Sequence, residues 1–160
     1  MATPSDLTPL ALFEGIAEPA LDKLAGLATL QSFAQGDVIY TFDEVSTFFG
    51  VVVTGRIMIE REVTPDIIAT TETLNPGDPF GLSSLIHGAR HKGAAHCRED
   101  SEVLLFTGTE VMALLDEEPE LGAKLLSRLY AVAVERLHVR TNQFIKLLGL
   151  NPELKAAMGD

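Results

Sequence analysis

The chain has 160 residues, of which 46% are hydrophobic, 12 are basic and 23 are acidic, giving a formal net charge of −11. These values predict one folded domain with a sizeable core, and the acidic balance argues against a nucleic-acid-binding surface, which needs clustered lysine and arginine. The lone cysteine, Cys97, excludes an internal disulfide, and no signal peptide or bilayer-length apolar run is visible, so we expect a soluble cytoplasmic protein without a membrane partner.

One domain is predicted over residues 7–149, between a flexible tail at 1–6 and a second tail at 150–160. Leucine and phenylalanine recur at intervals of two to four residues from Leu7 to Leu30, which predicts N-terminal helices. Pro19 is expected to begin the second of them, because proline is tolerated in the first turn of a helix.

From Ser32 onward, short apolar segments alternate with turns. Runs rich in valine and isoleucine predict strands over residues 38–40, 48–53, 56–60, 67–73 and 103–106. Closely spaced turns with no helices between most of these strands are typical of an antiparallel β-barrel or jelly roll. The fold class is therefore mainly β, flanked by N-terminal helices and a long C-terminal helix.

A short helix is expected directly after the last strand. Thr107 and Glu110 have the Thr-x-x-Glu spacing of a capping box, in which two side chains satisfy free backbone donors at a helix start. This pattern predicts a helix over residues 111–115.

The longest apolar repeat predicts a helix over residues 119–148, begun by Pro119 and ended by Gly149 and Pro152. Some thirty residues make a rod of about 45 Å, more than one small barrel can cover. Side chains spaced by three or four residues form a near-heptad seam, which comprises Leu126, Leu129, Ala133, Leu137, Arg140, Phe144 and Leu147. We expect this seam to form a homodimer; the alternative is a helix packed only on its own barrel.

The segment from Asn75 to Phe106 combines a turn, a helix start and a basic run. Free N–H groups at a helix start, together with cations nearby, are the parts of an anion-binding site. The candidate ligand-binding residues are Phe80, Gly81, Leu82, Ser83, Ser84, Arg90, His91 and Lys92.

This segment resembles the phosphate-binding cassette of cyclic nucleotide-binding domains, the modules of catabolite-activator-type regulators and of protein kinase A regulatory subunits. The family pattern is Phe-Gly-Glu, a small or apolar run, and Arg-x-Ala, and Phe80-Gly81 match its beginning. The resemblance extends over about residues 10–148. It implies cAMP or cGMP as the ligand, a glutamate that holds the ribose hydroxyl and an arginine that pairs with the cyclic phosphate.

Four positions depart from the family pattern. Leu82 stands at the glutamate position, His91 at the arginine position and Gly93 at the alanine position, while Asp43 occupies a turn where the family often has glycine. Loss of the glutamate removes a charge-assisted hydrogen bond, which costs about 1.5–3 kcal/mol or roughly tenfold to hundredfold in affinity. Histidine also replaces a permanent bidentate donor by a ring that is largely neutral at neutral pH.

Two functions stay open at this point. The first is a regulatory sensor that binds cAMP, cGMP or another small anion in the cassette and signals through the long helix. The second is a ligand-free dimeric interaction module with a degenerate pocket and a protein partner of unknown identity. Roughly a dozen residues follow the long helix, too few for the family's helix-turn-helix domain, so no DNA-binding domain is expected.

A metal or haem site is a weaker alternative. His87, His91, His96 and Cys97 lie close in sequence, and imidazole and thiolate are good metal ligands. Their spacing matches no metal motif, however, and His96 and Cys97 should point to opposite faces of a strand. No Ser-His-Asp, paired-carboxylate or phosphate-loop motif is present, so we expect neither a metal nor an enzymatic activity.

Overall fold

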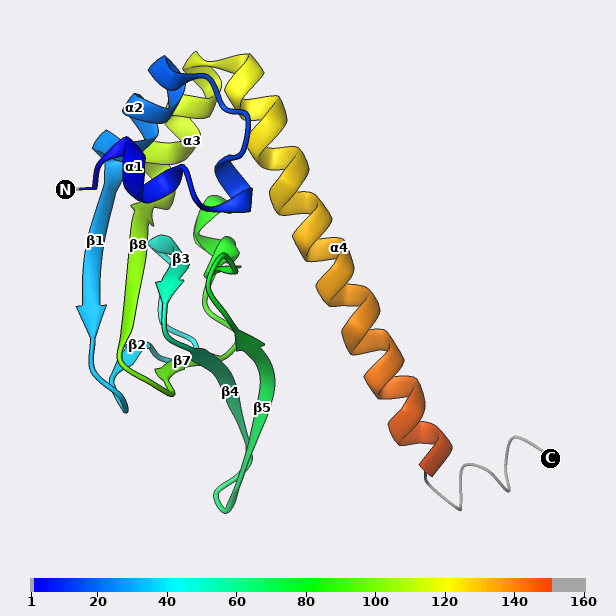
Figure 1. Cartoon of the computed structure of the whole chain (residues 1–160). Coiled ribbons are helices and arrows are strands. Elements are labelled where there is room, and N and C mark those ends of the chain that lie inside the picture. The colour runs from blue at the N-terminus through cyan, green and yellow to red at the C-terminus, as the bar shows by residue number, and fades with distance from the viewer. Residues whose placement is uncertain (1, 151–160) are drawn as a thin grey trace. The chain divides into compact units, whose positions relative to one another are not determined.

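The computed structural model of the chain describes residues 2–150 (Figure 1). It divides into two units, one that ends at Leu125 and one that begins at Leu126. The first unit contains every described strand. The second consists, within the described residues, of the remainder of one long helix.

The N-terminal segment is helical but ends earlier than predicted. It forms α1 (Pro4–Leu7), the 3₁₀ turn η1 (Ala11–Phe13) and α2 (Glu18–Leu27). The predicted flexible tail at 1–6 therefore includes most of α1. The prediction of helix up to Leu30 was wrong, because Leu30 lies in a strand and pairs with Leu104. Pairing with a distant strand overrides the local helical spacing there.

Within residues 2–150, eight strands form two antiparallel sheets of four, with the orders β1-β8-β3-β6 and β2-β7-β4-β5. Their bounds are β1 Ala28–Phe33, β2 Val38–Tyr40, β3 Phe48–Thr54, β4 Ile57–Thr64, β5 Ile67–Leu74, β6 Pro79–Phe80, β7 Ala94–Cys97 and β8 Ser101–Thr107. This architecture confirms the predicted jelly roll. Figure 1 shows the N-terminal helices at one end of the strands and the β4–β5 hairpin at the other.

The hydrophobic core lies between the two sheets. One buried cluster within it comprises Tyr40, Val52, Ile57, Ile59, Leu74, Phe80, Ala95, Cys97 and Val103. Near the helices, the ring of Phe106 stacks on that of Phe49 with centroids 4.9 Å apart, and its centroid is 5.8 Å from that of Phe13. Burying each large apolar side chain contributes about 1.5–3 kcal/mol, so these contacts fix the frame that carries the cassette.

The helix after β8 is α3, Gly108–Glu117. It begins next to Thr107 as predicted, but the Thr107 side chain makes no capping hydrogen bond, so the predicted capping box is wrong. The start of α3 is held by a tertiary contact, since the Gly108 amide donates to the Thr47 carbonyl at 2.9 Å.

The long predicted helix is present as α4, Pro119–Leu150. It continues through Gly149, contrary to the prediction that this glycine ends it, because a helix interior tolerates glycine at a cost of about 1 kcal/mol. Pro152 lies outside the described residues. Across positions 2–150, none of the helices combines the length and apolarity that crossing a membrane would need.

Candidate functional site

The cassette begins with a backbone geometry that requires glycine. After β6, Gly81 adopts a left-handed conformation with φ of 69° and precedes the 3₁₀ turn η2, Leu82–Leu85. A Cβ atom at Gly81 would lie 2.9 Å from the carbonyl oxygen of Phe48, so a larger residue would be both strained and crowded. The predicted helical turn is therefore present, and the buried ring of Phe80 anchors its start.

The two cassette serines contact other parts of the fold. The Ser83 hydroxyl is hydrogen-bonded to the Ser46 hydroxyl at 2.9 Å. Ser84 is buried, and within residues 2–150 its hydroxyl has no hydrogen-bond partner. The Ser84 carbonyl approaches Gly108 so closely that a Cβ there would lie 2.2 Å away. These contacts attach the cassette turn to the start of α3.

His91, at the family's arginine position, lies inside the protein. Its side chain is only 2% exposed, and its ring stacks on that of Tyr40 with centroids 3.6 Å apart and planes inclined by 7°. The Phe48 ring lies 6.2 Å away. Burial lowers the pKa of His91, and the nearby Glu44 carboxylate opposes this only in part. The ring is therefore neutral at neutral pH and offers no fixed positive charge.

The side chains of the two neighbouring basic residues point away from the core. Arg90 and Lys92 are exposed while His91 between them is buried, which is the alternation of an extended segment. The Arg90 guanidinium donates to the Asp43 carbonyl and lies 3.8 Å from the Asp43 carboxylate. The three basic residues of the predicted site therefore do not converge on one side of the chain.

A loop that we call the strap, Thr41–Ser46, holds the basic run in place. Its Asp43 and Ser46 amides donate to the carbonyls of His91 and Ala89, and the His91 amide donates to the Glu44 carbonyl, each at 2.9 Å. Within the described part of the chain, Asp43 is the sole residue other than glycine with a positive φ, at 62°. Position 43 is the turn position at which the family often has glycine.

The remaining departures from the family pattern also close the cassette. A Cβ atom at Gly93 would lie 2.8 Å from Cγ2 of Ile59 and 3.1 Å from the Glu60 carbonyl oxygen, so alanine does not fit without a shift of β4. Leu82 is half-buried and brings no charge. The substitutions at positions 82, 91 and 93 thus make the cassette apolar and closely packed.

No group of three or more metal-binding side chains that could hold an ion occurs among residues 2–150. His96 and Cys97 occupy opposite faces of β7: the His96 ring lies 3.8 Å from the Glu60 carboxylate, whereas Cys97 is buried. Burial raises the pKa of the Cys97 thiol. This alternation agrees with the sequence-based prediction for the pair.

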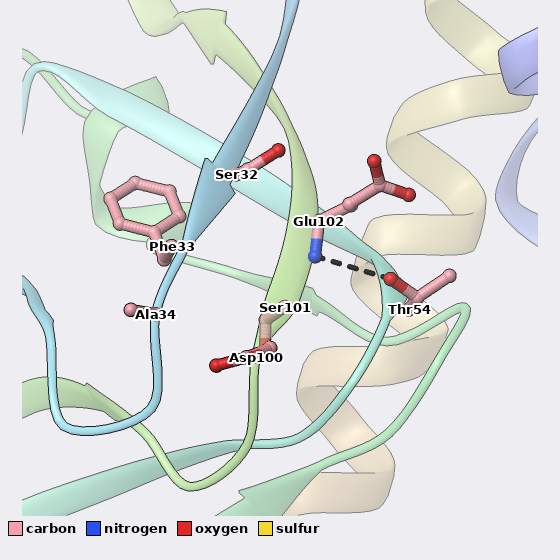
Figure 2. A pocket seen from close by; sticks show the side chains of 7 residues that line it. All are labelled: Ser32, Phe33, Ala34, Thr54, Asp100, Ser101 and Glu102. Carbon is pink, nitrogen blue, oxygen red and sulfur yellow. Dashed lines mark hydrogen bonds between the residues drawn. The ribbon is translucent and has the colours of Figure 1, made fainter.

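A shallow groove of about 390 Å³ lies at the ends of β1, β3 and β8, and no sequence motif indicated it (Figure 2). Its lining is Ser32, Phe33, Ala34, Thr54, Asp100, Ser101 and Glu102. Several polar atoms there serve the fold: the Glu102 amide donates to the Thr54 hydroxyl at 3.3 Å, and Asp100 accepts from the Gln35 amide. With two carboxylates and no cation, the groove does not suit an anion.

In the second unit, α4 carries a row of exposed side chains that differs from the predicted seam at one residue. Leu129 is only 4% exposed, whereas Tyr130 is 71% exposed. Replacing Leu129 by Tyr130 gives steps that alternate strictly between four and three residues, the spacing of a heptad. The stripe, as we call this row, comprises Leu126, Tyr130, Ala133, Leu137, Arg140, Phe144 and Leu147. The strict alternation was the signal that would have identified Tyr130.

The two-sheet roll with a short helical turn between β6 and β7 places the chain in the class of jelly-roll domains. A sequence model of the cyclic nucleotide-binding domain matches residues 30–118, more than half of the chain, and the chain belongs to that family. Comparison with curated proteins finds no match.

Solved structures show the same fold. A Geobacter metallireducens protein named for cyclic nucleotide binding has a TM-score of 0.75 at 22% identity, covering 86% of this chain and 100% of its own. A cyclic nucleotide-binding domain from Methylobacillus flagellatus gives 0.76 at 16%, covering 89% and 80%. The Thermus thermophilus catabolite activator protein gives 0.70 at 24%, covering 86% and 62%.

Proposed function

We propose that this chain is a non-catalytic regulatory module whose cassette, closed at neutral pH, does not bind cAMP or cGMP with the contacts typical of its family. Its output is self-association through α4. The observation that supports this most directly is the buried stack of His91 on Tyr40. A neutral ring in the core replaces the arginine that the family pattern uses for the phosphate.

The charges around the cassette support the same conclusion. A cyclic phosphate is best stabilised by a permanent cation with two parallel donors. Of the two exposed cations that flank His91, Arg90 is paired with Asp43 and Lys92 lacks the two parallel donors of a guanidinium. Leu82 offers no acceptor to a ribose hydroxyl. Each missing charge-assisted bond costs about tenfold to hundredfold in affinity.

The partner that we propose for α4 is a second copy of this chain. The stripe has the heptad spacing at which two identical helices can interlock their side chains. Its large members Tyr130, Leu137, Phe144 and Leu147 are all mostly exposed. A contiguous row of this kind on one helix face is typical of an interaction surface.

The ligand half of the proposal is tested by isothermal titration of the purified chain with cAMP and with cGMP at pH 7.5. We expect no saturable heat with either nucleotide. A micromolar dissociation constant for either one would overturn this half. Should binding occur, Arg90→Ala serves to ask whether the exposed guanidinium supplies it.

The association half is tested by analytical ultracentrifugation. We expect the wild-type chain to sediment as a dimer and Leu137→Glu to sediment as a monomer, because the substitution places a charge in the centre of the stripe. Gln143→Glu is the matched control: it adds the same charge at another exposed position of α4 that lies off the stripe. A monomeric wild type, or equal effects of the two variants, would contradict the proposal.

A further inference from the structure

His91 joins three segments that are separate in the sequence. Its ring stacks on Tyr40 at the end of β2 and faces Phe48 at the start of β3. The site where Gly81 would carry a Cβ lies 3.7 Å from its Cε1 atom, so the ring also contacts the cassette turn. Through its own amide and carbonyl, His91 is hydrogen-bonded to the strap. His91 thus bonds the strap through its backbone, while its side chain packs on Tyr40 and Phe48, which lie on either side of the strap in the sequence.

The arrangement suits only the neutral ring. A neutral imidazole stacks well between aromatic side chains, but a buried imidazolium without a paired counter-charge is strongly disfavoured. The groups that surround it on each packed element are the Tyr40 phenol on β2, apolar Phe48 on β3 and Gly81 in the cassette. Arg90 and Lys92 flank it in the sequence and add positive charge.

The strap supplies the one carboxylate that attracts the ring electrostatically. Glu44 is exposed, and its carboxylate accepts from the Thr41 amide at 3.0 Å and from the Thr41 hydroxyl at 3.2 Å. These bonds lower the pKa of Glu44, and the charge of a protonated His91 lowers it further. Glu44 therefore stays ionised in mild acid, when it can receive an imidazolium that leaves the core.

The strap is also held in a strained geometry. Asp43 has a φ of 62°, in the left-handed region that residues with a side chain seldom adopt. Its ion pair with Arg90 is exposed, and exposed pairs contribute little. Further attachments are the backbone hydrogen bonds of Asp43, His91 and Ser46 and the hydroxyl contact of Ser46 with Ser83. The Arg90 guanidinium also donates to the Asp43 carbonyl, and the Arg61 guanidinium lies 5.1 Å from the ring centroid of Phe42.

We propose that His91 is a proton-operated latch. In its neutral form it stacks on Tyr40 and keeps the strap against the cassette; on protonation the ring leaves the core toward Glu44 and the strap is released. Release exposes the interior that the ring fills and lets Asp43 relax. The latch is independent of the proposed function, since it requires neither a nucleotide nor a second copy.

Hydrogen exchange of the whole chain, followed by NMR, tests the latch at the amides of Asp43, His91 and Ser46. Protection factors, corrected for the intrinsic effect of pH, are compared at pH 7.5 and pH 5.0. Uptake of one proton changes an opening equilibrium by at most about tenfold per pH unit. We expect a loss of about tenfold or more at these three amides.

Two variants isolate the cause. His91→Phe keeps an aromatic ring on Tyr40 but cannot be protonated. Because an opening that takes up no proton does not depend on pH, the amide protection of this variant at pH 5.0 should stay within about twofold of its value at pH 7.5. His87→Asn removes an exposed histidine of the same loop and should behave as the wild type does. Constant wild-type protection, or an equal loss in His91→Phe, would overturn the latch.

If His91→Phe does not fold, the wild type still decides the question. The imidazole resonances of His91 and the ring resonances of Tyr40 are followed in one pH titration. The latch requires both sets to change with the same midpoint. Tyr40 signals that stay constant while His91 titrates would exclude it.

Discussion

The imidazole of His91 lies face to face with the phenol ring of Tyr40, with centroids 3.6 Å apart and planes inclined by 7°. Both residues are buried, so the position where the family pattern has a phosphate-binding arginine belongs here to the hydrophobic core. The contact links β2 to the basic run, and the strap connects the same two segments through its backbone. The stability of the fold and the closed state of the cassette therefore both depend on the contacts of His91.

Removal of the Tyr40 ring should be costly. Tyr40→Ala deletes a buried aromatic side chain and uncovers one face of His91, so we expect the free energy of unfolding to fall by about 3–5 kcal/mol. The pKa of His91 should rise toward its ordinary value. Urea unfolding and an NMR titration measure the two effects. Ile86→Ala, at an exposed position of the cassette loop, should change stability by less than about 0.5 kcal/mol.

Glycine at the strained strap position should stabilise the protein. Asp43→Gly permits the φ of 62° without a Cβ penalty, and we expect a gain of about 1 kcal/mol. Asp43→Ala is the matched comparison, because it also removes the carboxylate beside Arg90 but keeps the strain. Thermal unfolding of the two variants separates these effects. Equal stabilities would show that the backbone conformation is not the reason.

Alanine at position 93 should destabilise the protein even though the family pattern contains it. The added methyl group would lie 2.8 Å from Cγ2 of Ile59, and overpacking of this kind costs about 1–3 kcal/mol. A double-mutant cycle with Ile59→Ala, which removes that atom, checks the cause. The cost of Gly93→Ala should become smaller in the Ile59→Ala background, and purely additive effects would contradict the explanation.

Stability should decrease in mild acid because of His91. Its folded-state pKa lies below the ordinary value of 6.5, so as pH falls the unfolded state takes up the proton first. The free energy of unfolding therefore decreases from about pH 6.5 down to the folded-state pKa, and this contribution is fully present above pH 6.5. Urea unfolding between pH 8 and pH 5 should show a shallower dependence for His91→Phe than for the wild type.

Arg140 interrupts the apolar stripe of α4, and a polar residue at a seam position lowers the stability of a coiled coil while fixing its register. We expect Arg140→Leu to strengthen self-association by tenfold or more, equivalent to about 1.4 kcal/mol. Sedimentation at several concentrations measures the change. Unaltered association would place Arg140 outside the contact.

Local patterns were sufficient for most of the fold. The continuous valine-rich run at 48–53 predicted β3, and the repeat of three and four residues that begins at Pro119 predicted α4. Leu30 was misassigned because its pairing with Leu104 is a distant contact that no local window contains. Sequence periodicity predicts the secondary structure of a segment where residues close in the sequence determine that structure.

The short helical turn after Gly81 was predicted, but the orientation of the basic run was not. The order Arg90, His91, Lys92 shows three basic residues, and only the pairing of this segment with the strap decides which one faces inward. Such properties arise from the register between segments rather than from the segments themselves.

The close approach of Ile59 to Gly93 has an evolutionary consequence. A descendant of this chain that regained the family's alanine at position 93 would first need a smaller residue at position 59, because the two side chains compete for one space. An arginine at position 91 would likewise meet the ring of Tyr40. Enabling substitutions in β2 and β4 must therefore precede those in the cassette, and a lineage that changes the cassette first passes through less stable intermediates.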